Sequence, residues 1–197
     1  MSHMKILPNS TTEFSGIYTS RGNTKLGKSV GTINRMPGDT CPGESEWCSW
    51  ACYAKGGMFF YQWKRYKTSN IELPEKFPPF VRIHASGDFD SEAYIDWISQ
   101  MVKSNHETLF WAYTRSWRIP ALLPALEALR GLPNMQLFAS TDVTTELPPD
   151  GWRVAFIEGD TRFKGPLCME QTGAKPSCAS CGYCFKGFRN NIQFRQH

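Results

Sequence analysis

The chain has 197 residues, of which 41% are hydrophobic and 20% are charged, and its formal net charge is +4 at neutral pH. This length suffices for one domain with a real hydrophobic core and makes a second independent domain unexpected. No apolar run approaches membrane length and no secretory leader stands at the start, so we expect a cytoplasmic protein with no membrane partner. Residues 1–4 have the composition of a cloning scar and are excluded from any site.

The first predicted strand spans residues 29–36, and a cysteine-rich loop follows it directly. The cysteines of this loop are Cys41, Cys48 and Cys52. With no histidine or further cysteine nearby, three thiolates suggest an iron-sulfur cluster that leaves one iron open, unless Glu44, Glu46 or a distant residue completes the site.

Aromatic residues crowd around this loop and are expected to limit the access of solvent to a cluster. They are Trp47, Trp50, Tyr53, Phe59, Phe60 and Trp63. Membership of an ordinary core is the alternative for about half of them.

Residues 80–157 alternate between strand-like and helix-like patterns. Strands are predicted at 80–85, 108–113, 135–139 and 153–157, because apolar residues there alternate or run continuously between turn residues. A helix is predicted to begin after Asp90 or Ser91 as its N-cap. A second helix follows Ile119, with prolines in its first turns and Gly131 as its stop.

Repeated strand-helix-strand units predict the α/β fold class. We expect a single domain over residues 1–197, with a parallel sheet of about five strands that is open or curled into a partial (βα) barrel. Cysteine-rich loops stand at both ends, and residues 161–197 form a basic, cysteine-rich C-terminal extension.

Each of the later strands ends in a polar cluster. Ligands of α/β sheets bind at the carboxyl ends of the strands, so successive clusters there predict a lined pocket, although turn chemistry alone accounts for any one of them. The candidate cofactor-binding residues are Ser86, Gly87, Asp88, Thr114, Arg115, Ser140, Asp142 and Glu158.

The second cysteine group is Cys168, Cys178, Cys181 and Cys184. Its Cys-x2-Cys-x2-Cys run brings three thiolates onto one tight loop, as in bacterial ferredoxins, with a fourth supplied from elsewhere. Zinc is the main alternative, followed by disulfides or free thiols. A reducing compartment and an odd cysteine count argue against a disulfide framework.

From residue 161 onward the chain is basic. Six cations stand against Glu170 alone: Arg162, Lys164, Lys175, Lys186, Arg189 and Arg195. This surplus can offset the negative charge of a four-thiolate cluster. The alternative is a nucleic-acid partner, since Phe185, Phe188 and Phe194 interleave with the last three cations and could stack on bases.

Several motifs resemble known families. A cysteine triplet after the first strand, with aromatic residues around it and a Gly-acid step after the second strand, resembles the radical S-adenosylmethionine (SAM) superfamily. More closely, five motifs resemble a phage family known as gene product 88, over residues 16–188. They are Cys-Pro at 41–42, Cys-Tyr-Ala at 52–54, Ser-Gly-Asp-Phe at 86–89, Tyr-Thr-Arg at 113–115 and the Cys-x2-Cys-x2-Cys ending.

The superfamily resemblance implies that the first three cysteines hold a 4Fe-4S cluster whose open iron binds SAM, with Gly87 and Asp88 near the amino group of that cofactor. It also implies an auxiliary cluster on the last four cysteines, a small-molecule substrate and, for a phage protein, the cytoplasm of the host cell. A non-catalytic iron-sulfur electron carrier and a zinc-stabilised nucleic-acid-binding protein remain open as alternatives.

Overall fold

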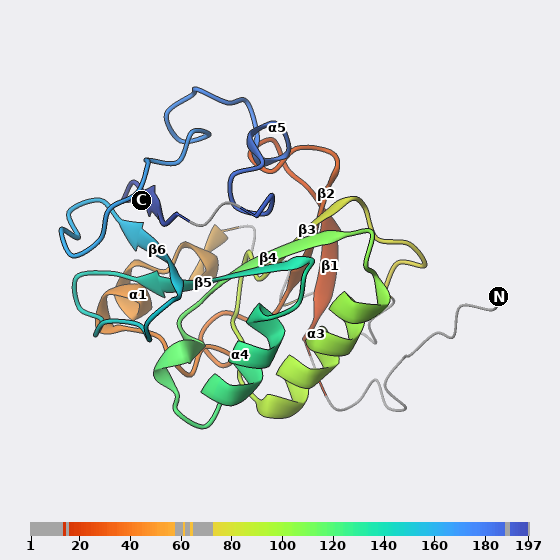
Figure 1. The fold of residues 1–197 in the computed structure, drawn as a ribbon, viewed down its shortest axis with the longest axis horizontal. Coiled ribbons are helices and arrows are strands. Elements are labelled where there is room, and N and C mark those ends of the chain that lie inside the picture. The colour runs from red at the N-terminus through yellow and green to blue at the C-terminus, as the bar shows by residue number, and fades with distance from the viewer. Residues whose placement is uncertain are drawn as a thin grey trace.

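The computed structural model describes residues 14, 16–57, 61, 64, 73–187 and 190–196. In this part of the chain seven strands form one sheet, in the order β1 to β7 (Figure 1). β1 pairs antiparallel with β2, and all the other neighbouring strands are parallel. The strands are β1 (Tyr18–Arg21), β2 (Val30–Asn34), β3 (Phe80–Ile83), β4 (Leu109–Thr114), β5 (Met135–Thr141), β6 (Arg153–Ile157) and β7 (Ile192–Phe194).

The helices of the described residues are α1 (Glu46–Ala51), α3 (Glu92–Ser104), α4 (Leu123–Arg130) and α5 (Cys178–Cys181), with 3-10 turns η1 (Tyr53–Lys55) and η2 (Ser116–Arg118). Two of them, α3 and α4, were predicted from the sequence. The Ser91 hydroxyl accepts a hydrogen bond from the Tyr94 backbone N–H and so caps α3, as predicted. Gly131 ends α4, as predicted.

Helices α3 and α4 cover one face of the sheet (Figure 1). The β3–β4 and β4–β5 crossovers have the same hand and fall on the same face, which explains why the two helices lie side by side. The core between them and the sheet includes Val81, Ile83, Phe110 and Leu137, which alternate with residues of the opposite face. This arrangement leaves the second face without a helical layer of the usual kind.

The cysteine-rich C-terminal segment, residues 161–187, covers that second face. The ring of Phe185 is buried there, with its centroid 4.5 Å from that of Phe80 and 4.8 Å from that of Trp111. Cys168 is buried in a neighbouring cluster with Phe138. The segment is therefore part of the core, and Phe185 is not available for stacking on bases.

The predicted number of five strands is wrong, because the two edge strands were missed. β1 has the mostly polar sequence Tyr-Thr-Ser-Arg and β7 has three residues, so neither carries a long apolar pattern. β1 and β7 are the two edges of the sheet; its curling into a partial barrel stays a prediction. Among the described residues, no helix is long and apolar enough to cross a bilayer.

Candidate functional site

The carboxyl ends of β3, β4 and β5 carry a buried network of charged side chains. Asp88 accepts hydrogen bonds from Thr114 Oγ1 at 2.6 Å and from the Arg115 backbone N–H at 2.7 Å. The Arg115 guanidinium binds Asp142 Oδ2 at 2.6 Å, and Asp142 is fully buried. The structure thus brings together four of the residues predicted to meet at this edge; their role as cofactor ligands stays a prediction.

The two carboxylates of the network, Asp88 and Asp142, have pKa values that are shifted in opposite directions. Burial raises the pKa of Asp88 to about 6, although hydrogen bonds from Thr114 and from the Arg115 backbone oppose the rise. Burial acts in the same direction on Asp142, but hydrogen bonds from Ser45 and Thr144 and the charge of Arg115 hold its pKa below the usual value. Asp142 is therefore the more firmly ionised of the two.

The same network fixes the first cysteine loop to the sheet. The Ser45 hydroxyl donates to Asp142 Oδ2 and accepts a hydrogen bond from the Cys48 backbone N–H at 3.0 Å, which caps α1. The Arg118 guanidinium donates to the carbonyl oxygens of Gly43 and Glu44 at 2.9 and 3.0 Å. A Cβ at Gly43 would lie 2.1 Å from the Arg115 carbonyl oxygen, so only glycine permits this close approach.

The three thiols of this loop lie near one another beside the network. Burial, together with negative charge on Asp88, Cys48 and Cys52, raises the pKa of Cys41 to about 12. The pKa of Cys48 is raised by burial, while the charge of Arg115 opposes the rise. Cys52 follows α1 directly, four residues after Cys48, which places the two on the same side of the helix.

Two members of the predicted aromatic shield are exposed. Trp50 is 85% exposed on α1, a short helix that buries none of its residues, and Tyr53 is 50% exposed on η1. The Tyr53 hydroxyl nevertheless donates to the Ala85 carbonyl oxygen at 2.6 Å and so ties the loop to the end of β3. Trp47 is half-buried, and the predictions for Phe59, Phe60 and Trp63 lie outside the described residues.

The second cysteine group is held on the face of the sheet opposite α3 and α4. Cys178 and Cys181 lie on the single turn of α5, which is capped by Ser177 and ended by Gly182 in the left-handed conformation (φ 72°). Burial raises the pKa of Cys184 to about 12, and hydrogen bonding with Tyr113 opposes the rise. Thiolate charges on Cys178 and Cys168 would raise it further, so these sulfurs also lie near one another.

Two arginines that the sequence analysis did not single out lie beside this second group. The Arg82 guanidinium lies over the Tyr113 ring, 5.2 Å from its centroid, and Arg153 lies 4.1 Å from the centroid of Phe138. Both interact electrostatically with Cys184. A signal was present for Arg82, since it is a charged residue at a period-two position of the apolar strand Phe-Val-Arg-Ile.

The donor sets can be tested against the two kinds of centre. Among the described residues, no group of three or more His, Cys, Asp or Glu side chains could hold a metal ion as placed. A tetrahedral zinc needs sulfurs at about 2.3 Å from one point. A cluster binds each cysteine through a different iron, so its sulfurs need not converge on one point. All seven cysteines are free of disulfides, and an iron-sulfur centre on either set stays a prediction.

Four predicted cofactor residues lie outside the charged network. The Ser86 hydroxyl donates to the Arg35 carbonyl oxygen at 2.6 Å, and Gly87 has a φ of 79°. Ser140 takes part through its carbonyl oxygen, which accepts from Trp117 Nε1 at 3.3 Å. Glu158 is exposed, because its backbone N–H continues the pairing with β7 while its side chain points to solvent. Glu158 is therefore placed apart from the charged network, and a pocket shared by the eight residues stays a prediction.

Asp160 takes the place at the sheet edge that was predicted for Glu158. Its carboxylate binds the Arg162 guanidinium at 2.7 Å. The same guanidinium donates to the Asp142 carbonyl oxygen at 2.6 Å, which joins the end of β6 to the end of β5. Arg162, one of the six basic residues of the C-terminal segment, is thus committed to an internal contact.

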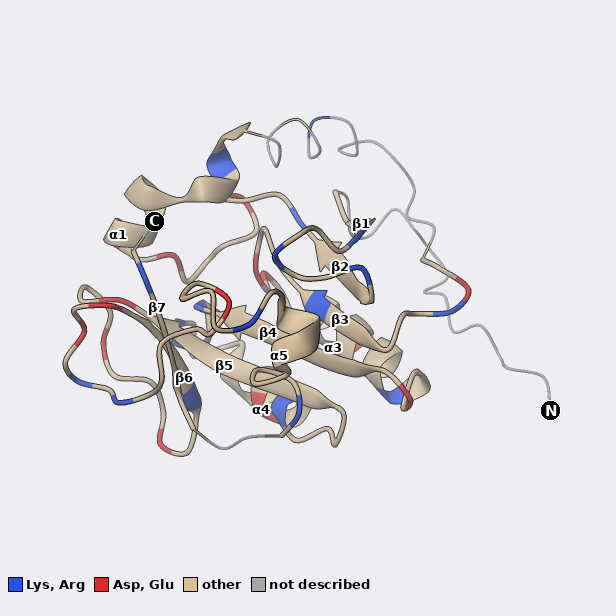
Figure 2. Ribbon diagram, turned by 90° about the horizontal axis from the view of Figure 1, so that it is seen from above, with Lys and Arg blue, Asp and Glu red and all other residues tan. Residues whose placement is uncertain are grey.

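Contacts within the described part of the chain do not neutralise most of the basic residues of the C-terminal segment. Glu170 lies 3.6 Å from Lys25, which is outside the segment, and Arg195 donates to the uncharged Gln171 carbonyl oxygen at 3.3 Å. Figure 2 shows Lys and Arg interspersed with Asp and Glu on several segments. The predictions for Phe188 and Arg189 lie outside the described residues, and a nucleic-acid partner stays a prediction.

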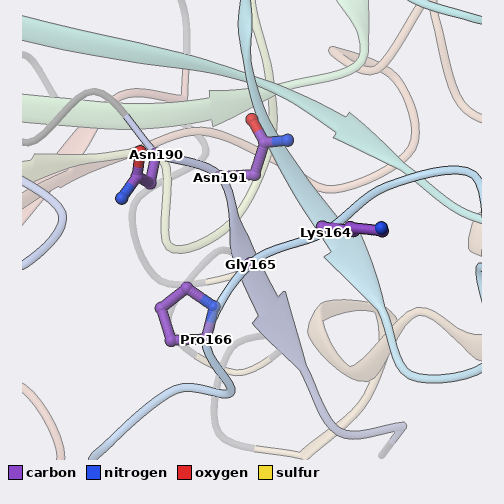
Figure 3. A pocket seen from close by; sticks show the side chains of 5 residues that line it. All are labelled: Lys164, Gly165, Pro166, Asn190 and Asn191. Carbon is purple, nitrogen blue, oxygen red and sulfur yellow. The ribbon is translucent and has the colours of Figure 1, made fainter.

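A depression of about 350 Å³ lies beside β7 (Figure 3). It is lined by Lys164, Gly165, Pro166, Asn190 and Asn191. No cysteine and no predicted cofactor residue lines it.

The sequence is similar to a family of phage proteins. A family model described as Gene product 88 matches residues 69–164, which contain Asp88, Arg115 and Asp142. The chain resembles the gene product 88 proteins. It is 25% identical to the Gene 88 protein of Mycobacterium phage L5, over 87% of this chain and 89% of that protein. It is 26% identical to the Gene 88 protein of Mycobacterium phage D29, over 89% and 90%.

The predicted relationship to the gene product 88 family is supported by these matches. Both cysteine groups fall outside the residues of the family model, while the two relatives are similar over most of the chain. No solved structure matches this chain.

Proposed function

We propose that this chain is an iron-sulfur protein with two centres, one on Cys41, Cys48 and Cys52 and one on the last four cysteines. The observation that carries the proposal is the attachment of the first cysteine loop to the carboxyl edge of the sheet. Arg118 binds the loop through the Gly43 carbonyl oxygen, and Asp142 accepts hydrogen bonds from Ser45 of the loop and from Arg115. Three thiols are thereby held at the edge where α/β proteins bind ligands.

The burial of the thiols supports the same proposal. In the absence of a metal, burial raises the pKa of Cys41 and Cys184 to about 12, so both are protonated at neutral pH. A cationic centre reverses this balance because it binds the thiolate and releases the proton. Buried cysteines that repel one another as thiolates are better explained by a shared cation than by general packing.

The activity that we propose is radical SAM chemistry at the first centre. A cluster with three protein ligands, when bound, would supply an open iron and an electron for cleaving the sulfonium of SAM. The chain would contribute the loop that holds the three thiols and the carboxylate of Asp88. This carboxylate is buried and close enough to Cys41 to raise the pKa of its thiol.

A second candidate function is electron transfer without catalysis. The observation that favours it is that the groups of the charged network already form hydrogen bonds with one another and with neighbouring residues. Asp142 accepts hydrogen bonds from Ser45, Arg115 and Thr144, so its oxygens are already occupied. A carboxylate used in this way holds a loop in place and is not free to bind a cofactor.

One experiment separates the two candidates. The full-length protein is purified anaerobically, reduced with dithionite in the presence of SAM, and assayed for 5′-deoxyadenosine. If the protein is a radical SAM enzyme, we expect this product from the wild type and from Cys181→Ala, and no product from Cys52→Ala. Reversible reduction of the cluster without product supports the electron carrier, and a protein without iron rejects both functions.

A further inference from the structure

Arg82 is a cation on the inner side of the C-terminal segment, without a counter-charge. The pleat of β3 places Val81 and Ile83 in the core under α3 and α4, and Phe80 and Arg82 on the opposite face. Phe80 packs there against Phe185, which directly follows Cys184, the last cysteine of the Cys-x2-Cys-x2-Cys run. Arg82 is therefore held on the face that the second cysteine group covers.

The guanidinium of Arg82 has no partner that accounts for its position. Its Nε is buried and makes no hydrogen bond within the described part of the chain, and no carboxylate there lies within ion-pair distance. Arg82 as a whole is half-buried, and even partial burial of an unpaired charge is costly, so such groups are found beside an opposite charge. The aromatic face of Tyr113 supplies only part of that compensation.

The groups that face Arg82 become anionic when a metal centre is present. Burial opposes the charge of Arg82, but its pKa is nevertheless raised by interaction with Tyr53, Tyr113, Cys178 and Cys184. Two of these four are cysteines of the second group. No described carboxylate lies within ion-pair distance of this guanidinium, so thiolates held by a centre would supply its nearest negative charge.

Arg153 repeats the pattern on the other side of Cys184. Its guanidinium donates to the neutral oxygens of Gln136 and of the Asn190 backbone at 2.8 and 3.0 Å, and no described carboxylate pairs with it. The charged groups nearest to Cys178 are otherwise Lys25 and Glu170, which pair with each other. The two arginines therefore leave a local excess of positive charge around the cysteines.

Resting on the two-centre function proposed above, we infer that Arg82 is the positioning residue that compensates the charge of the C-terminal centre. Four thiolates outweigh the charge of a divalent ion or of a doubly charged cluster core, so the loaded centre is anionic. Arg82, with Arg153 opposite, would neutralise that excess and favour the reduced, more negative form of a cluster. The residue is expected to set the reduction potential of this centre while contributing no ligand to it.

The test is a potentiometric titration of the anaerobically purified full-length protein, followed by electron paramagnetic resonance. In Arg82→Met we expect the reduced form of one centre to become about tenfold less favoured at a fixed potential, a fall of about 59 mV for a one-electron couple. In Arg82→Lys, which keeps the charge, we expect less than a third of that fall. Lys103→Met removes an exposed charge from α3 on the opposite face and should change neither potential.

The outcomes separate this inference from the function on which it rests. Iron in the wild type with equal potentials in all three variants overturns the role of Arg82 and leaves the two-centre function standing. A wild type without iron overturns both. If Arg82→Met loses the C-terminal centre altogether, retention of that centre by Arg82→Lys supports charge compensation, and its loss from both variants overturns it.

Discussion

Arg115 and Asp142 form a buried ion pair, with 2.6 Å between the guanidinium and the carboxylate, that joins the ends of two neighbouring strands. The same Asp142 oxygen also binds Ser45, which lies in the first cysteine loop. One carboxylate therefore connects β4, β5 and the loop that carries the proposed cluster ligands. Variants of Asp142, Asp88 and Gly43 test this connection, and a variant of Phe185 tests the packing of the second cysteine group.

Removing the charge of Asp142 should destabilise the fold. Asp142→Asn leaves the buried guanidinium of Arg115 without its counter-charge, and we expect a loss of about 3 kcal/mol in the free energy of unfolding. Urea unfolding measures it, with Asp150→Asn as the control because Asp150 is exposed. The connection to the loop also predicts faster labelling of Cys48 by a thiol reagent. Equal unfolding curves for the two variants would contradict the account.

Asp88 should make stability depend on pH. Its pKa is raised by burial from 3.8 to about 6, so the protonated form is favoured by folding. The associated stabilisation of about 3 kcal/mol is complete below the unfolded pKa and is lost as the pH rises through about 6. We expect Asp88→Asn to remove this decline between pH 4 and 7, as measured by urea unfolding at each pH. Parallel pH profiles of wild type and variant would show that Asp88 titrates normally.

The alternation of apolar residues was enough to predict the inner strands of the sheet, since β3 to β6 each run through a buried core. It was not enough for β1 and β7, whose few residues hold edge positions by pairing with a neighbour. The meeting of Asp88, Arg115 and Asp142 followed from the shared edge of parallel strands. Their bonds to one another did not, because sequence does not fix which oxygen a given donor reaches.

The sequence did not reveal that the C-terminal segment covers the second face of the sheet. A segment with six basic residues and interleaved phenylalanines has the composition of a solvated or nucleic-acid-binding tail, and composition does not reveal that Phe185 completes a core cluster. The roles of Arg82 and Arg153 were missed for the same reason. Their partners, Tyr113 and Cys184, become neighbours only when the C-terminal segment folds back over β4.

A glycine in the first cysteine loop should be irreplaceable. The Cβ of Gly43→Ala would lie 2.1 Å from the backbone oxygen of Arg115, and we expect destabilisation by about 2 kcal/mol together with displacement of the loop. Gly56→Ala is the matched control, since a Cβ there meets nothing within 4 Å and its φ is negative. Thermal unfolding compares the two. Equal melting temperatures would mean that the loop is not packed against η2 as described.

Phe185 should hold the second cysteine group on the sheet. Phe185→Ala removes a buried ring from between Phe80 and Trp111, and we expect a loss of about 4 kcal/mol. Cys178, Cys181 and Cys184 should then react with a thiol reagent while the first group is unchanged. Phe163→Ala, at a half-buried ring, is the control and should have a smaller effect. Retained protection of the last cysteines in Phe185→Ala would contradict the packing described.

The central claim is that folding gathers the seven cysteines into two separate iron-sulfur centres. Its most direct test is the content of iron and acid-labile sulfide per chain in anaerobically purified wild type, Cys52→Ala and Cys181→Ala, with circular dichroism to verify folding. We predict about eight irons in the wild type and about half of them in each folded variant. Colourless wild-type protein without iron, or the loss of all iron from one folded variant, would contradict the claim.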